Sequence, residues 1–87
     1  MKNLYMTKGV MELTETNGKF AKQVAKAVER FRWLDWGDLC EEDKNANDRA
    51  VTARERIVAR YNIEPRAIYI IAEADRSATT ILFPEEY

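Results

Sequence analysis

Residues 67–87 read AIYIIAEADRSATTILFPEEY and contain two apolar runs on either side of a short polar cluster. Both runs, AIYIIA and ATTILF, are rich in β-branched and aromatic residues, which favours strands. The polar cluster suits a short hairpin loop, and Pro84 cannot continue a paired central strand. The sequence therefore predicts a C-terminal antiparallel hairpin, and its tip consists of Asp75, Arg76 and Ser77.

The first predicted strand, residues 67–72, is apolar on both faces. A sheet with one face in water alternates apolar and polar residues, so both faces of this strand need cover. Either two helices cover opposite faces, or both helices pack on one face and a partner covers the other. We favour the second arrangement, in which a protein partner, or a second copy of the chain forming a homodimer, contacts the second apolar face. The two faces carry Ile68, Ile70 and Ala72 on one side and Ala67, Tyr69 and Ile71 on the other.

A helix is predicted from Lys19 to about Trp33, because apolar residues recur there at spacings of three and four. Thr16 or Asn17 is the candidate N-cap. The apolar stripe consists of Phe20, Val24, Ala27, Val28, Phe31 and Leu34. The opposite side carries a basic row of Lys19, Lys22, Lys26 and Arg30, which is either a solvated face or a nucleic-acid contact.

A second helix is predicted from Asp38 to about Tyr61. Gly37 interrupts the apolar spacing of the first helix, and Asp38 followed by Glu41 fits an acidic variant of the capping box. Further acids follow in the first turn, where the helix dipole favours negative charge. Pro65 disfavours helical geometry at the residue before it and stops the helix. The predicted inner face consists of Ala46, Ala50, Ala53, Ile57 and Tyr61.

Residues 3–15, NLYMTKGVMELTE, alternate loosely and form a candidate short strand that includes Val10, Met11 and Leu13. A chain of 87 residues has room for one core, so residues 1–87 are predicted to be a single domain. The predicted fold class is α+β. A small antiparallel β-sheet, made of the C-terminal hairpin and the candidate N-terminal strand, packs against two α-helices.

The composition excludes several kinds of chemistry. The chain has no histidine and one cysteine, Cys40, so it can form neither an internal disulfide nor a histidine-based catalytic triad. Acidic neighbours disfavour a thiolate, and Cys40 is expected to be a packing residue. Carboxylates offer oxygen ligands to a cation such as Mg²⁺, but acids at helix starts are more often structural, so neither a metal nor a cofactor is predicted. The acids weighed for that role are Asp35, Asp38, Glu41, Glu42, Glu73 and Asp75.

Charge and hydropathy limit the partners. The net charge is −1, with basic blocks at 1–32 and 49–66 and acidic blocks at 33–48 and 67–87. Bulk charge therefore does not favour nucleic acid, and recognition has to depend on a local patch. No apolar run approaches the roughly 18 residues that cross a bilayer, and no signal-peptide pattern is present. We expect a cytoplasmic protein with no membrane contact.

Two tryptophans and the hairpin tip are the candidate recognition residues. Trp33 is expected in the core, whereas Trp36 is either core or an exposed interface residue. Arg76 pairs with Asp75, pairs with the acids near Asp38, or contacts only water. If the hairpin tip folds towards the start of the second helix, one partner surface forms. It consists of Trp36, Asp38, Glu41, Glu42, Asp75, Arg76 and Ser77.

The stretches DWGDLCEEDKNAND and EADRSATTILFPEEY resemble small proteins of unknown function encoded on bacterial plasmids and other mobile elements. The similarity covers Asp35–Asp48 and about Ile70–Tyr87, and it is weak in the N-terminal third. The resemblance carries no catalytic assignment. It implies a context, because small proteins of mobile elements often act by binding, for instance as inhibitors of host restriction or CRISPR machinery.

Three functions follow for testing. The first is a protein-interaction module of a mobile element that inhibits host defence, and it is the one we favour. The second is a nucleic-acid-binding regulator that uses Lys19, Lys22, Lys26 and Arg30; its binding would weaken steeply with salt. The third is a metal-dependent enzyme, which we favour least because no catalytic constellation is present; we therefore predict that the chain is not an enzyme.

Overall fold

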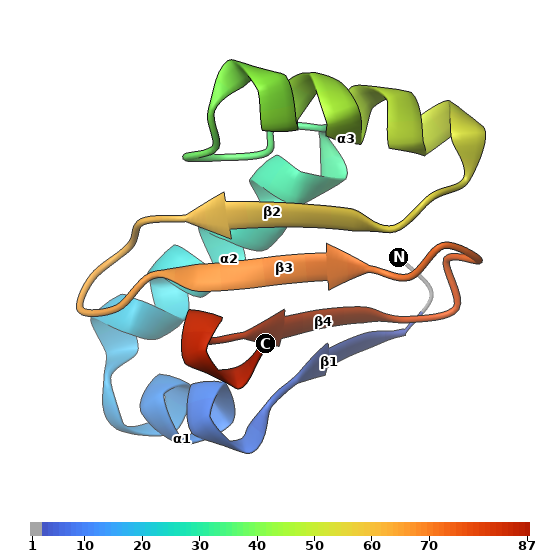
Figure 1. The fold of residues 1–87 in the computed structure, drawn as a ribbon. Coiled ribbons are helices and arrows are strands. Elements are labelled where there is room, and N and C mark those ends of the chain that lie inside the picture. Colours follow the sequence, from blue (N-terminus) through green and yellow to red (C-terminus); the bar gives the residue numbers. More distant parts are fainter. Residues whose placement is uncertain (1–2) are drawn as a thin grey trace.

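The computed structural model describes residues 3–87, which form a four-stranded sheet with helices at its inner face and at one edge (Figure 1). In chain order the elements are β1 (Leu4–Met6), α1 (Lys8–Thr16), α2 (Gly18–Arg32), α3 (Glu41–Ala53), β2 (Ile57–Tyr61), β3 (Ile68–Ala72), β4 (Thr79–Leu82) and a 3₁₀ turn, η1 (Pro84–Glu86). The α+β fold class is confirmed. No helix among the described residues is long and apolar enough to cross a membrane.

The sheet has the strand order β1-β4-β3-β2. β3 is antiparallel to both of its neighbours, β2 and β4, so the predicted C-terminal hairpin is confirmed. The amide of Glu73 donates a 3.0 Å hydrogen bond to the carbonyl of Ala78 and closes the hairpin loop. β1 lies parallel to β4, and the sheet is therefore mixed rather than wholly antiparallel.

The N-terminal segment is mostly helical, contrary to the predicted strand over residues 3–15. Only Leu4–Met6 is a strand, and α1 begins directly after Thr7, whose hydroxyl accepts a 3.4 Å hydrogen bond from the amide of Val10. Val10 is fully buried on one side of α1. The spacing of three between Val10 and Leu13 suits a helix, and a loose alternation over the same residues concealed it.

α2 agrees with the prediction. Asn17 is its N-cap, and the side-chain oxygen of Asn17 accepts a 3.0 Å hydrogen bond from the amide of Phe20. Four members of the apolar stripe are buried, namely Phe20, Val24, Ala27 and Phe31. Leu34 lies beyond the end of the helix, has a φ of 64° and is 53% exposed.

α3 is shorter than predicted. It ends at Ala53, where Arg54 adopts a left-handed backbone with φ 56°, and Ile57–Tyr61 is strand β2. Alternate residues of β2 are buried, which is the period of a strand. The N-cap is Cys40, which is exposed rather than packed, and Asp38 instead accepts a 2.8 Å hydrogen bond from the amide of Asn62. Of the predicted inner face, Ala46 and Ala53 are exposed and Ala50 is buried.

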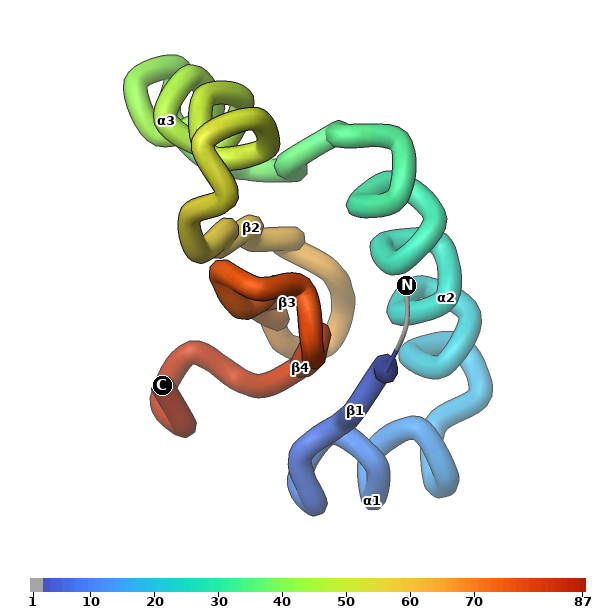
Figure 2. The backbone as a smooth tube through the Cα atoms, turned by 90° about the vertical axis from the view of Figure 1, so that its right-hand side faces the viewer, coloured from blue at the N-terminus to red at the C-terminus, as the bar shows by residue number. Residues whose placement is uncertain are grey.

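The core lies between α2 and the inner face of the sheet, which is the face that carries Ile57, Tyr61, Ile70 and Ile81. Figure 2 shows α2 on one side of the sheet, α3 beside β2, and the C-terminal segment on the other side. On the outer face, Ile71 and Leu82 are already 2% and 6% exposed in the single chain. The second apolar face is therefore partly covered by the chain itself.

The β2 edge of the sheet is closed by the segment before it. The side-chain amide of Asn47 donates a 2.9 Å hydrogen bond to the carbonyl of Val58 and accepts one of 3.4 Å from its amide. Gly37 forms an isolated parallel bridge with Arg60 further along β2. α3 thus satisfies the backbone of an edge strand that would otherwise be open to pairing.

Candidate binding groove

The predicted recognition surface is divided between the two ends of α3. Asp38, Glu41 and Glu42 lie at the start of α3, whereas the hairpin tip lies at its C-terminal end (Figure 1). A helix of 13 residues is about 20 Å long at ~1.5 Å per residue. Asp38 and Arg76 therefore lie at opposite ends of α3 rather than side by side.

Arg76 turns inward and holds the hairpin tip against α3. Its Nη2 donates a 2.9 Å hydrogen bond to the carbonyl of Ala50, and its Nη1 donates one of 2.7 Å to the carbonyl of Glu55. Nη1 also reaches the carbonyls of Glu73 and Ala74, at 2.9 Å and 3.3 Å. The guanidinium contacts backbone carbonyls, and this arrangement differs from each of the three alternatives considered from the sequence.

Asp75 and Ser77 form a local turn at the tip. The amide of Ser77 donates a 3.0 Å hydrogen bond to Asp75. The Ser77 hydroxyl, and then its amide, hold the pKa of Asp75 below its usual range. Both residues are exposed, and their polar groups are directed to each other.

The two tryptophans have opposite environments. Trp36 is 3% exposed, its ring lies edge-on to Phe31 at 5.4 Å, and its Nε1 donates a 2.9 Å hydrogen bond to Asp48. Trp33 is 78% exposed, so the expectation that it belongs to the core is wrong. α2 ends at Arg32, and the next two residues leave the buried side of the helix.

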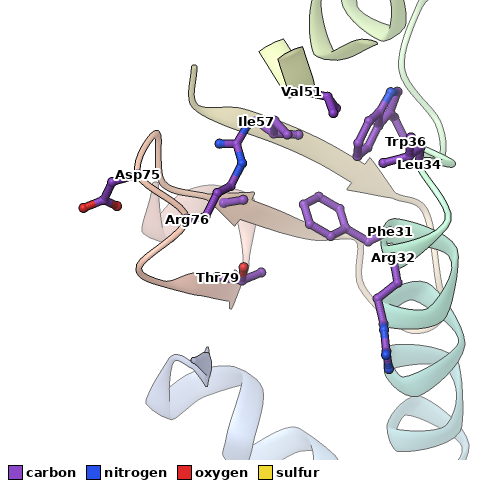
Figure 3. Close-up of a pocket in the computed structure, with 10 residues that line it drawn as sticks. Phe31, Arg32, Leu34, Trp36, Val51, Ile57, Asp75, Arg76 and Thr79 are labelled. Carbon is purple, nitrogen blue, oxygen red and sulfur yellow. The ribbon is translucent and has the colours of Figure 1, made fainter. Parts of the chain in front are cut away.

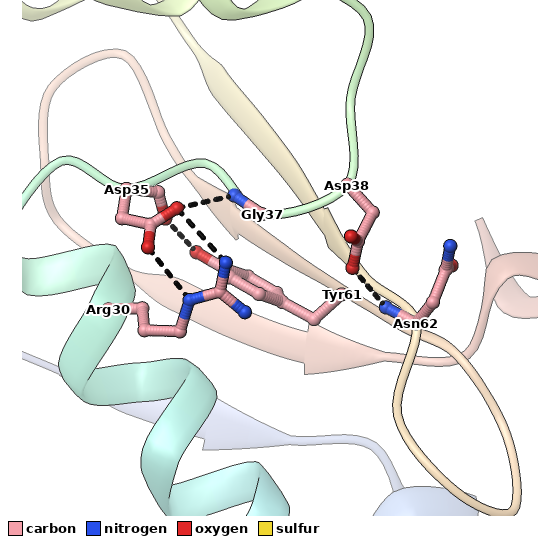
Figure 4. A network of polar contacts seen from close by, with 6 residues as sticks. All are labelled: Arg30, Asp35, Gly37, Asp38, Tyr61 and Asn62. Atoms are coloured by element: carbon pink, nitrogen blue, oxygen red, sulfur yellow. Dashed lines mark hydrogen bonds and ion pairs between the residues drawn. The ribbon is translucent and has the colours of Figure 1, made fainter.

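A polar network fixes the loop that positions Trp36 (Figure 4). Arg30 donates hydrogen bonds of 2.8 Å and 3.2 Å to the Asp35 carboxylate, which also accepts one of 3.0 Å from the amide of Gly37. These bonds hold the pKa of Asp35 below its usual range, and the bond from Arg30 has the largest effect. The hydroxyl of Tyr61 donates to the Asp35 carbonyl at 2.7 Å, and burial raises the pKa of Tyr61.

The same network changes the predicted basic row. Arg30 is neutralised by Asp35, and its guanidinium carbon lies 5.3 Å from the centre of the Tyr61 ring. The other three members of the row, Lys19, Lys22 and Lys26, are exposed along α2. The structure therefore presents three lysines there in place of the four predicted cations.

Between the end of α2, α3 and the sheet lies a hollow of about 470 Å³, which we name the Phe31 cleft (Figure 3). The ring of Phe31 points into it, Trp36, Val51 and Ile57 border it, and the carboxylate of Asp75 points away. Its lining consists of Phe31, Arg32, Leu34, Trp36, Val51, Ile57, Ala72, Asp75, Arg76 and Thr79. Sequence reasoning predicts Trp36 as a candidate but misses the cleft, because residues of five elements and two loops meet there.

A second hollow of about 420 Å³ lies between β1 and α2, and we name it the Val28 cleft. Its lining is almost wholly apolar and consists of Leu4, Met6, Thr14, Ala21, Val24, Ala25, Val28 and Ile81. The two clefts adjoin, because Leu4 of one is the register partner of Thr79 of the other. Both lie on the inner side of the sheet, along α2.

Within residues 3–87, no cluster of three or more acidic or cysteine side chains is placed to hold a metal ion. Of the three ionisable residues that line the Phe31 cleft, Asp75 points outward, Arg76 binds carbonyls, and Arg32 is exposed. What the cleft can do is bury apolar groups of another molecule. Comparisons with protein-family models, curated proteins and solved structures find no match for this chain.

Proposed function

We propose that the chain is a protein-interaction module that binds a partner polypeptide at the Phe31 cleft. The single observation that carries the proposal is a hollow of about 470 Å³, lined by both apolar and polar residues, whose rim bears the exposed side chain of Leu34. Trp33, next in the chain and 78% exposed, adds a large apolar contact beside it. Tryptophan is enriched among the residues that carry binding energy in protein interfaces.

The backbone of Leu34 supports this proposal. A leucine with φ 64° is in the left-handed region, which costs a residue with a Cβ roughly 1–2 kcal/mol. That conformation keeps an apolar side chain in water at the mouth of the cleft, which further disfavours the unbound state. Strained backbone of this kind clusters at binding and catalytic sites. A partner that covers Leu34 removes part of this unfavourable hydration.

The resemblance to proteins of bacterial mobile elements suggests the first form of this function to test. We propose an inhibitor that docks on host restriction or CRISPR machinery. Such an inhibitor needs no catalytic group of its own, and a domain of 87 residues can present one binding surface. The exposed lysines of α2 make nucleic acid the competing partner, and its binding would weaken with added salt.

The test compares two exposed apolar residues that lie apart. Leu34 is 53% exposed at the Phe31 cleft, and Met11 is 45% exposed on α1. Partners captured by cross-linking in a bacterial host are purified and their affinity for the chain is measured. Leu34→Glu should weaken binding by about tenfold or more, because a carboxylate replaces a desolvated apolar contact. Met11→Glu should leave the affinity unchanged, and both variants should melt near the wild-type temperature.

An equal loss of affinity in both variants, or in neither, would show that the Phe31 cleft is not the binding site. The chain can instead be tested with purified nucleic acid. If it binds nucleic acid as tightly as any purified protein, and if added salt abolishes that binding, the nucleic-acid alternative replaces the proposal.

A further inference from the structure

The two edges of the sheet differ in how their backbone groups are satisfied. At the β2 edge, Asn47 and the loop around Gly37 form hydrogen bonds with the backbone of the strand. The opposite edge is β1, and within residues 3–87 no further strand pairs with it. Figure 1 shows β1 along the border of the sheet, with α1 beyond its C-terminal end. The β1 edge is therefore open to a strand of another molecule.

The hydrogen bonds between β1 and β4 identify which backbone groups of β1 are free. The carbonyl of Asn3 accepts a 2.8 Å hydrogen bond from β4, and the amide of Thr7 donates one of 3.0 Å to β4. Backbone groups of successive residues in a strand point to opposite sides, so Asn3, Tyr5 and Thr7 all face β4. The amide and the carbonyl of both Leu4 and Met6 therefore point away from the sheet.

The side chains of this edge strand are apolar and exposed. Leu4 is 46% exposed and Tyr5 is 54% exposed. Sheets usually protect an open edge with charged residues or proline in the strand, or by keeping the strand very short. β1, with the sequence LYM, contains neither a charge nor a proline, and its length of three residues is its one protection. That length also limits which strand can pair with it.

We propose that β1 pairs with β1 of a second copy of the chain, antiparallel and about a two-fold axis at Tyr5. Leu4 and Met6 flank Tyr5 at equal distance in the sequence. In this register the free amide and carbonyl of Leu4 meet the free carbonyl and amide of Met6 of the second copy, and the two-fold axis repeats the pair. The four free backbone groups of each copy are then bonded, and two four-stranded sheets become one continuous sheet.

The side chains of β1 match in the same register. Leu4 and Met6 both line the Val28 cleft on the α2 side of the sheet, so Tyr5 faces the other side. Tyr5 meets Tyr5 of the second copy at a position where the two Cα atoms are about 4.5 Å apart. Aromatic pairs placed in this way stabilise a sheet. On the α2 side, Leu4 contacts Met6 of the second copy, which removes apolar surface from water.

The length of β1 favours a second copy over a strand of a different protein. A strand of the usual five or six residues would extend beyond β1 and leave part of its own backbone unpaired. β1 of a second copy has the same three residues and begins and ends in register. The contact is smaller than the ~1,200 Å² of stable complexes, so the dimer is reversible and forms at high concentration. This proposal does not depend on the function proposed above.

The test uses the symmetry of the pair. In wild type, sedimentation should show the fraction of dimer rising between about 10 μM and 1 mM. Tyr5→Lys and Tyr5→Glu should each be monomeric alone, because two like charges meet at the axis. An equal mixture of the two variants should recover a dimer that contains one copy of each. Met11→Lys and Met11→Glu, at an exposed apolar residue of α1, are the matched controls and should dimerise like wild type.

Amide hydrogen exchange of the wild type provides a second measurement that needs no substitution. Exchange at Leu4 and Met6 should slow as the concentration rises, because their amides are bonded only in the dimer. Exchange at Tyr5 should change much less, since its amide faces β4 within one copy.

A wild-type chain that stays monomeric at about 1 mM, with exchange at Leu4 and Met6 independent of concentration, would overturn the proposal. A dimer that persists in Tyr5→Lys, or a mixture of the two Tyr5 variants that remains monomeric, would show that the axis does not lie at Tyr5. If a purified partner protein, rather than a second copy, slows exchange at Leu4 and Met6, the edge binds a strand of that protein and the dimer is wrong.

Discussion

The hydroxyl of Tyr61 and the backbone carbonyl of Asp35 are joined by a 2.7 Å hydrogen bond, which ties the end of β2 to the loop after α2. Tyr61 is fully buried, and its ring also lies under the guanidinium of Arg30. This contact is one of the bonds that fix the loop that carries Trp36 into the core.

Tyr61→Phe should lower the free energy of unfolding by about 1–2 kcal/mol, because the carbonyl of Asp35 loses its partner while the packing of the ring is kept. Urea denaturation measures the change. Tyr5→Phe is the control, since the Tyr5 side chain is 54% exposed, and it should have almost no effect. Equal effects of the two substitutions would contradict a structural role for the Tyr61 hydroxyl.

The Asp35 carboxylate should contribute to stability only above acidic pH. Its bonds to Arg30 and Gly37 lower its pKa in the folded state. Its contribution is therefore full above the unfolded pKa of about 3.9 and is lost as the pH falls through the lower folded value. The side chain is 49% exposed, so the difference between wild type and Asp35→Asn should be under about 1 kcal/mol. Unfolding followed from pH 7 to pH 2 should show this difference shrinking; a constant difference would contradict the assignment.

Arg76→Ala should lower the free energy of unfolding by about 1.5–3 kcal/mol, because a charged donor and several backbone acceptors lose their bonds. Asp75→Ala, at the same tip, should leave it almost unchanged, because the Asp75 side chain is exposed. Arg76→Gly loses the same guanidinium but accepts φ 61° without a Cβ, so it should be more stable than Arg76→Ala by about 1 kcal/mol. Arg76→Ala with wild-type stability would show that the tip is held by other contacts.

Asn47→Ala should be strongly destabilising, since it leaves both backbone groups of Val58 without their partner. The expected loss is about 2–3 kcal/mol in chemical denaturation. Asn45→Ala lies on the exposed side of the same helix and is the matched control, with an expected change within about 0.5 kcal/mol. Faster amide hydrogen exchange at Val58 in Asn47→Ala, but not in Asn45→Ala, would locate the loss of stability at the β2 edge.

Gly37→Ala and Gly18→Ala should act in opposite directions. Gly37 has φ 77°, and a Cβ there would collide with the carbonyl oxygen of Arg60 and the ring of Tyr61. The expected loss exceeds about 2 kcal/mol. Gly18 lies in the first turn of α2 with open space around its Cα, so alanine should raise stability by up to about 1 kcal/mol. Thermal unfolding of the two variants shows whether each substitution raises or lowers the melting temperature. A change in the same direction in both variants would contradict this account.

The hairpin and α2 could be predicted from the sequence because each is encoded by a local period. Residues 67–83 contain two short apolar strands on either side of a polar turn. The helix Gly18–Arg32 follows an N-cap residue and has apolar residues at helical spacing. β2 was mistaken for the end of a helix, because Ala53, Ile57 and Tyr61 are also four residues apart. The left-handed turn at Arg54 separates the two elements, and an arginine gives no signal of such a turn.

The candidate site could not be predicted, because it depends on contacts between distant segments. The direction of Arg76 depends on its φ of 61° and on carbonyls 26 and 21 positions away. Leu34 continues the spacing of the α2 stripe, yet its backbone turns it into solvent. The two clefts are lined by residues from both halves of the chain, so their position follows from the packing of α2 on the sheet.

The parallel pairing of β1 with β4 has a consequence for synthesis on the ribosome. Thr7, directly after β1, bonds through its hydroxyl to Glu86, 79 positions later. β1 thus has no paired neighbour until β4 (Thr79–Leu82) has been translated. During that interval Leu4 and Met6 lack the strand with which they pair in the folded chain, and a nascent chain halted before β4 would leave β1 unpaired.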